Sequence, residues 1–179
     1  MKQTILAIAA IILSPFALFA QGAPPSKNPV SDAVRSLVER ESKNLVAAAD
    51  EMPADKYSFH PTPDQMTFGH LVVHMAGSNN FLCSKISGTP APTGEKLSDT
   101  DPKDKLLGAL KASFQYCTEA LAKVDDSNLG EELTLFGGRT MTRAAAMIAL
   151  TNDFADHYSM AATYLRLNSL LPPTAQKKN

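Results

Sequence analysis

The residue types that could bind a metal ion gather in two stretches of this sequence. Asp153 and His157 are four residues apart, so on a helix they lie one turn apart on the same face. That face also carries apolar residues, and a carboxylate near an apolar interior is costly unless a cation, a metal ion or hydrogen-bond donors compensate it. His74 lies near the apolar side of another predicted helix. Helical bundles commonly build metal sites from side chains that project inward from facing helices.

The spacing leaves a second interpretation open. D-x-x-x-H is a weak pattern, and Asp153 and His157 can equally form a surface pair on one helix, with His74 an unrelated core histidine. The two other histidines, His60 and His70, are expected to be structural or solvent-exposed. Spacing alone does not decide between a metal site and these ordinary roles.

Four segments with helical apolar periodicity must position these side chains. Cap residues, prolines and glycines bound them, at about residues 28–53, 67–88, 101–124 and 142–168. The linker 125–140 is expected to be irregular, with room for a short extended turn, and no segment alternates strongly enough to predict a strand. The sequence therefore predicts an all-α protein, a four-helix bundle over residues 28–173 followed by a disordered tail at 174–179.

Composition excludes several classes of protein. The chain has 179 residues, which suits one domain, and a net charge of −1 with 7% aromatic residues. An electrostatic nucleic-acid binder would carry a basic face, so no nucleic-acid partner is expected. Enough of the chain is apolar, 44%, to bury a core, which argues against a disordered protein.

The first 22 residues have the parts of a secretory signal peptide. Lys2 is the positive start, Ile5–Leu13 is a short apolar stretch, and Pro15 interrupts any longer helix. Cleavage is predicted after Gly22 or, in competition, after Ala20. We therefore expect an exported protein, periplasmic or extracellular, with no stable membrane anchor after cleavage.

Two longer stretches resemble the DinB family, in particular its exported bacterial members. The first is the run Met52-Pro-Ala-Asp-Lys-Tyr-Ser-Phe-His-Pro-Thr-Pro-Asp-Gln-Met-Thr-Phe-Gly69, followed by His70-Leu-Val-Val-His74. The second consists of Leu135-Phe-Gly-Gly-Arg-Thr140, Asp156-His-Tyr158 and Tyr164-Leu-Arg-Leu-Asn-Ser-Leu-Leu-Pro-Pro173. The resemblance covers about residues 30–173 and implies an up-down-down-up four-helix bundle.

The resemblance also implies a divalent metal held by three histidines, one on the second helix and two in an H-x-x-x-H on the last. His74 matches the first ligand and His157 the third. Asp153 stands where the family has the middle histidine. Aspartate can ligate Zn²⁺ or a harder ion, so Zn²⁺ is the preferred cofactor, with Ni, Mn or Fe as alternatives. The same departure fits a weakened or lost site.

The family topology bears on the two cysteines. It makes the second and third helices parallel, and Cys83 and Cys117 stand at nearly equal distances from the starts of these helices. They would then lie at one level of the bundle, so a Cys83–Cys117 disulfide is predicted. The alternative is a pair of buried free thiols, each filling a small apolar space.

The function that the resemblance implies is metal-dependent hydrolase or transferase chemistry on an unknown small molecule. No catalytic residue can be assigned, and Asn152 and Asp156, which lie near the ligands in sequence, are expected on the solvated surface. The alternative is a non-catalytic binding or stress-associated module with a degenerate metal site. A homodimer is compatible with either function.

Overall fold

The computed structural model describes residues 25–177. The predicted signal peptide, its two cleavage positions and the last two residues of the predicted tail lie outside this range. Within it, no helix combines the length and the apolar character needed to cross a membrane.

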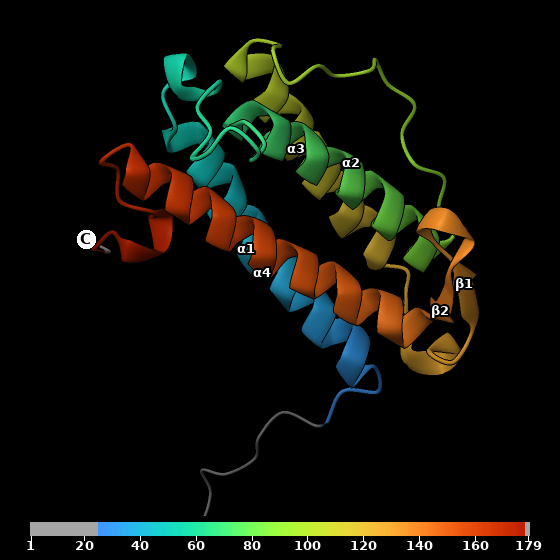
Figure 1. Cartoon of the computed structure of the whole chain (residues 1–179). Helices are drawn as coiled ribbons and strands as arrows, with labels where there is room; N and C mark the ends of the chain where they lie inside the picture. Colours follow the sequence, from blue (N-terminus) through green and yellow to red (C-terminus); the bar gives the residue numbers. More distant parts are fainter. Residues whose placement is uncertain (1–24, 178–179) are drawn as a thin grey trace, which may run out of the picture.

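Four long helices make up the bundle, as the sequence predicts. They are α1 (Pro29–Glu51), α2 (Phe68–Ser87), α3 (Lys103–Leu121) and α4 (Arg143–Leu167). Figure 1 shows that α2 and α3 run in the same direction, and that the connection between them returns along the length of the bundle. Helices α1 and α4 run the opposite way, so the up-down-down-up all-α topology is confirmed.

The linker before α4 contains a small hairpin. Strands β1 (Glu132–Thr134) and β2 (Thr140–Thr142) pair antiparallel, with Leu133 opposite Met141. Each strand has only three residues, which is too short for an alternating pattern to identify. The hairpin lies where α2 ends and α4 begins (Figure 1), and β1 contacts both helices.

Local signals account for most of the helix ends. The Thr67 hydroxyl accepts a hydrogen bond from the His70 amide at the start of α2, and Gly88 ends that helix in the left-handed conformation with φ of 70°. Helix α1 begins with Asn28 at the N-cap position and Pro29 as its first residue, an arrangement typical of a helix start. Asn28 makes no capping hydrogen bond with its side chain. The carboxylate of Asp126, far along the chain, accepts bonds from the amides of Val30 and Ser31 instead.

Buried aromatic residues tie the connector before α2 to the core. The Tyr57 hydroxyl donates to the Ala49 carbonyl of α1, and the Tyr164 hydroxyl donates to the Met66 carbonyl. The Phe68 ring packs against both tyrosine rings. The connector is therefore fixed at the beginning of α2, the helix that carries His74.

Part of the predicted disordered tail has a defined position. Pro173–Ala175 form a short 3₁₀ helix. The Tyr158 hydroxyl donates to Thr174 Oγ1 and accepts from the Thr174 amide, and Gln176 donates to the carboxylate of Glu51. Side chains of α1 and α4 therefore contact residues 174–176 in the structure, while disorder of the tail in solution stays a prediction.

The parallel arrangement of α2 and α3 brings the two cysteines together. Cys83 and Cys117 lie at disulfide distance, with their Cα atoms 5.2 Å apart and a separation of 34 positions in the sequence. Both side chains are fully buried. The bond would join α2 to α3 about one turn before the C-terminal end of each helix.

We expect the unfolded, unreduced protein, produced in an oxidising compartment, to contain no titratable thiol. Reduction should then lower the free energy of unfolding by roughly 3–4 kcal/mol, because the bond restricts a loop of this length in the unfolded chain. Thiol titration in denaturant and urea unfolding with and without reductant measure both effects. Two titratable thiols in the unreduced sample would show that the cysteines are unpaired.

Gly69 allows two loops to approach the first turn of α2. A Cβ at this position would lie 2.4 Å from the Asp99 carbonyl oxygen and 3.3 Å from that of Tyr57. The Gly69 amide donates to the same Tyr57 carbonyl at 2.7 Å. Backbone atoms cannot move aside as a flexible side chain can, so any larger residue here displaces the connector or the long loop.

Gly69→Ala should therefore lower the free energy of unfolding by about 1–3 kcal/mol, the usual cost of overpacking. Gly108→Ala is the matched control, because it lies inside α3 with no atom within 4 Å of the added Cβ. There alanine should stabilise the helix by up to about 1 kcal/mol. Urea unfolding of both variants tests this, and equal effects would contradict the steric explanation.

Candidate metal centre

Three side chains from two helices converge between α2 and α4. His74, Asp153 and His157 each offer one ligand atom, and these atoms all lie within 4.8 Å of one another. The two imidazole rings have their centroids 5.0 Å apart, at an angle of 65°. The structure thus brings together the three residues that the sequence singles out, while the metal itself stays a prediction.

The bundle positions these residues through its core packing. Asp153 and His157 are one turn apart on α4, and Leu150 and Phe154 beside them are fully buried. On α2, the buried residues Leu71 and Met75 flank His74. Because α2 and α4 pack against each other, the three polar side chains lie at the edge of the core, with His157 buried and His74 exposed.

Asp153 has an unsatisfied oxygen in this cluster. Its Oδ2 is buried and has no hydrogen-bond partner. His157 Nδ1 lies 3.3 Å from that oxygen, an ion-pair distance without hydrogen-bond geometry. A buried carboxylate oxygen without a donor is costly, and a divalent cation would compensate it. Two imidazoles and one carboxylate are also a donor set that Zn²⁺ and related ions accept. The residues present therefore fit a divalent metal.

The electrostatics of His74 point the same way. Partial burial lowers the pKa of His74 below its ordinary value, the nearby His157 and His70 lower it further, and Asp153 raises it. A lowered pKa keeps the imidazole neutral near pH 7, and the neutral imidazole is the form that binds a metal.

The remaining histidines lie outside this cluster, as expected. His60 Nδ1 contacts the Thr62 carbonyl oxygen in the connector. His70 is exposed, and its Nδ1 lies 3.7 Å from a carboxylate oxygen of Asp99. Asn152 and Asp156 are both exposed on α4. These positions agree with the solvated or structural roles that the sequence predicts for them.

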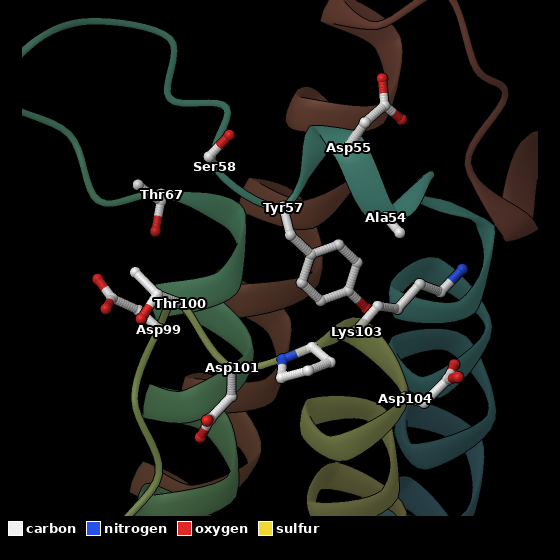
Figure 2. Close-up of a pocket in the computed structure, with 11 residues that line it drawn as sticks. Ala54, Asp55, Tyr57, Ser58, Thr67, Asp99, Thr100, Asp101, Lys103 and Asp104 are labelled. Carbon is white, nitrogen blue, oxygen red and sulfur yellow. The ribbon is translucent and has the colours of Figure 1, made fainter.

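A cavity of about 480 Å³ lies near the start of α2 and α3, and none of the three metal-site residues lines it (Figure 2). Its acidic lining includes Asp99, Asp101 and Asp104. Parallel packing places the N-termini of α2 and α3 at this end of the bundle (Figure 1), and carboxylates stabilise the positive end of a helix dipole. The acidic residues are therefore explained by the fold, without a ligand.

The family is decided by the sequence match of residues 37–161 to the DinB superfamily. The chain belongs to the DinB superfamily. No curated protein sequence matches the chain. Two DinB-like proteins have similar structures. The one from Bacillus subtilis has a TM-score of 0.65 and 19% identity, and the match covers 81% of this chain and 99% of that chain. The one from Bacillus cereus has a TM-score of 0.66 and 18% identity, and the match covers 79% of this chain and 95% of that chain.

A mycothiol-dependent maleylpyruvate isomerase also shares the DinB fold. Its TM-score is 0.60 at 15% identity, over 72% of this chain and 59% of the isomerase chain. At these identities the structural likeness shows the fold alone.

Sequence reasoning found the three clustered residues of this DinB bundle, but it missed an aromatic pair nearby. Phe81 of α2 and Phe136 of the hairpin stack with ring centroids 3.7 Å apart. Phe81 follows His74 by seven residues, which places it on the same helical face. The seven-residue spacing from His74 could have identified Phe81, whereas the position of Phe136 depends on a turn that helical periodicity does not predict.

We expect His74 of metal-free protein to titrate below 6.5, its ordinary pKa. Asp153→Asn should lower the pKa further, because it removes the negative charge that favours the protonated ring. The folded protein binds a proton at His74 less readily than the unfolded chain does. The free energy of unfolding should therefore decrease as the pH falls from 6.5 toward the lower pKa of His74 in the folded state. NMR titration of the histidine rings in chelator-treated protein measures the shift. An upward shift of the His74 pKa in Asp153→Asn would contradict this assignment of charges.

Proposed function

We propose that this DinB protein binds one divalent metal ion through His74, Asp153 and His157. The observation that carries the proposal is the buried Asp153 oxygen, which has no hydrogen-bond partner and lies beside two imidazoles. An ion there would satisfy this oxygen and occupy the three ligand atoms at once. Zn²⁺ is the preferred ion, and Ni, Mn or Fe are the alternatives, because a carboxylate makes the ligand set harder than three histidines.

The proposed site is open on one side. His157 is buried and His74 is exposed, so a ligand reaches the cluster from the His74 side. Three protein ligands leave further coordination positions free, as in catalytic rather than structural zinc sites. A divalent ion supplies Lewis-acid activation of a substrate oxygen at such a site. His157 and Asp153 would hold it from the core side, and the packing of α4 orients both.

We infer a metal-dependent hydrolase or transferase that acts on a small molecule, with hydrolysis favoured. One protein with this fold is a mycothiol-dependent isomerase, and thiol-dependent chemistry is therefore compatible with the scaffold. Low-molecular-weight bacterial thiols are cytoplasmic, however, and the N-terminal sequence supports export to the periplasm or the exterior. A cysteine pair at disulfide distance agrees with an oxidising compartment.

A second candidate is a binding module without catalysis. Within residues 25–177, no side chain hydrogen bonds to His74, Asp153 or His157, so no proton-transfer partner is held there by a hydrogen bond. This observation, together with aspartate in place of the family's histidine, favours a site that binds a metal and a small molecule without turnover.

Metal analysis tests the proposal. Mature protein reloaded separately with Zn, Ni, Mn and Fe should hold about one equivalent of at least one ion, and His157→Ala and Asp153→Ala should hold almost none. A bound ion present at a hundred times its dissociation constant should raise the free energy of unfolding by about 2.7 kcal/mol. Mass spectrometry and urea unfolding measure the two effects. Less than about a tenth of an equivalent for every ion would refute the metal site.

Asp156→Ala is the matched control, because Asp156 is an exposed carboxylate on the same helix. It should keep the metal and the stability gain. The loaded protein is then assayed on esters, amides and thiol conjugates. Turnover that disappears in Asp153→Ala but persists in Asp156→Ala supports the enzyme, and metal binding without turnover supports the binding module.

A further inference from the structure

An aromatic pair lies two helical turns along α2 from His74. With a neighbouring lysine it forms a layered surface, which we call the aromatic platform and define as Phe81, Phe136 and Lys85. The Phe81 and Phe136 rings are stacked at an interplanar angle of 21°. The Lys85 ammonium lies 5.6 Å from the centre of the Phe81 ring. Phe136 is 57% exposed even though it is stacked, so much of its ring faces solvent.

The hairpin turn holds Phe136 in this position. Leu135 before it is buried, and its amide donates to the Arg139 carbonyl oxygen at 2.8 Å. Gly137 and Gly138 both have positive φ, which allows the tight turn that follows Phe136. The ring therefore projects from a short, anchored turn rather than from a long loop.

The platform lies on the same helical face as the metal ligand of α2. Phe81 follows His74 by two helical turns, about 10 Å along the axis. Lys85 is one further turn along that face, and among the described residues no carboxylate lies within ion-pair distance of its ammonium group. A molecule that extends from the metal toward the hairpin would thus reach an aromatic surface beside an uncompensated positive charge.

We propose that the aromatic platform binds the apolar tail of a substrate whose polar head lies at the metal. This inference rests on the proposed metal site. The tail is an uncharged aliphatic or aromatic group about two helical turns long, because Phe136 supplies a flat apolar surface and Lys85 disfavours a cationic group. Phe136 is accordingly a specificity-determining residue that contacts the tail and not the reacting atoms.

Three hydroxamates that share one metal-binding head test the platform on Zn-loaded protein by calorimetry. They are acetohydroxamate, 6-phenylhexanohydroxamate and 6-aminohexanohydroxamate. The phenyl probe should bind about tenfold more tightly than acetohydroxamate, as expected for an apolar group placed on an aromatic face. The amino probe should bind no more tightly than acetohydroxamate. Phe136→Ala should remove most of the gain of the phenyl probe.

Ile148→Ala is the matched control, because Ile148 is a similarly exposed apolar residue, 59%, on α4. It should keep the whole gain. If the phenyl probe gains as much affinity over acetohydroxamate in Phe136→Ala as in wild type, the platform proposal is wrong. It is also wrong if Phe136→Ala and Ile148→Ala lose this gain equally. Failure of acetohydroxamate to bind counts against the metal site instead.

A metal-free measurement tests the platform even if the metal site fails or if Phe136→Ala does not fold. At millimolar concentration, the phenyl probe should show nuclear Overhauser contacts to the Phe136 ring of chelator-treated wild-type protein. Contacts only to other apolar residues would overturn the proposal.

Discussion

The parallel packing of α2 and α3 is the constraint on which the other features of this bundle depend. Parallel neighbours cannot be joined by a tight turn, so the chain must return along the bundle between them (Figure 1). The same packing brings Cys83 level with Cys117 and places two helix N-termini, with their acidic residues, at one end. In this arrangement one side of α2 packs against α3 and another side packs against α4, where His74 lies close to Asp153 and His157.

That division of α2 explains why the cluster lies at an edge rather than in the centre of the bundle. Cys83 and Asn79 lie on the flank toward α3, where the Asn79 side chain donates to the Ser113 hydroxyl. His74 lies on the opposite flank, partly open to solvent. A fully central cluster would bury three polar groups without access for a ligand, whereas an edge position buries His157 and leaves one side accessible.

Prediction from the sequence succeeded where the cause is local. Thr67 and Gly88 bound α2 through their own hydrogen-bonding and conformational preferences, and these are visible within a few residues. The side chain that accepts the first amide hydrogen bonds of α1 could not be predicted, because Asp126 reaches Val30 from a distant part of the chain. For the site, helical spacing paired Asp153 with His157. Predicting that His74 lies beside these two residues required knowing how the helices are arranged, and only the family resemblance gave that arrangement.

Aspartate in the middle ligand position changes the charge balance of the cluster. Three neutral imidazoles around a divalent ion leave a net charge of +2, whereas one carboxylate reduces it to +1 and strengthens the attraction for the ion. The reduced charge makes the ion a weaker Lewis acid, and the metal-free protein is left with a partly buried anion that has one oxygen unpaired. A metal ion bound at the proposed site would therefore contribute more to stability than it would in a three-histidine site. A metal site with this lower charge would attract anionic groups less strongly. Recognition of a substrate at the proposed site would then depend more on contacts away from the metal, and the aromatic platform, two helical turns along α2 from His74, could supply them.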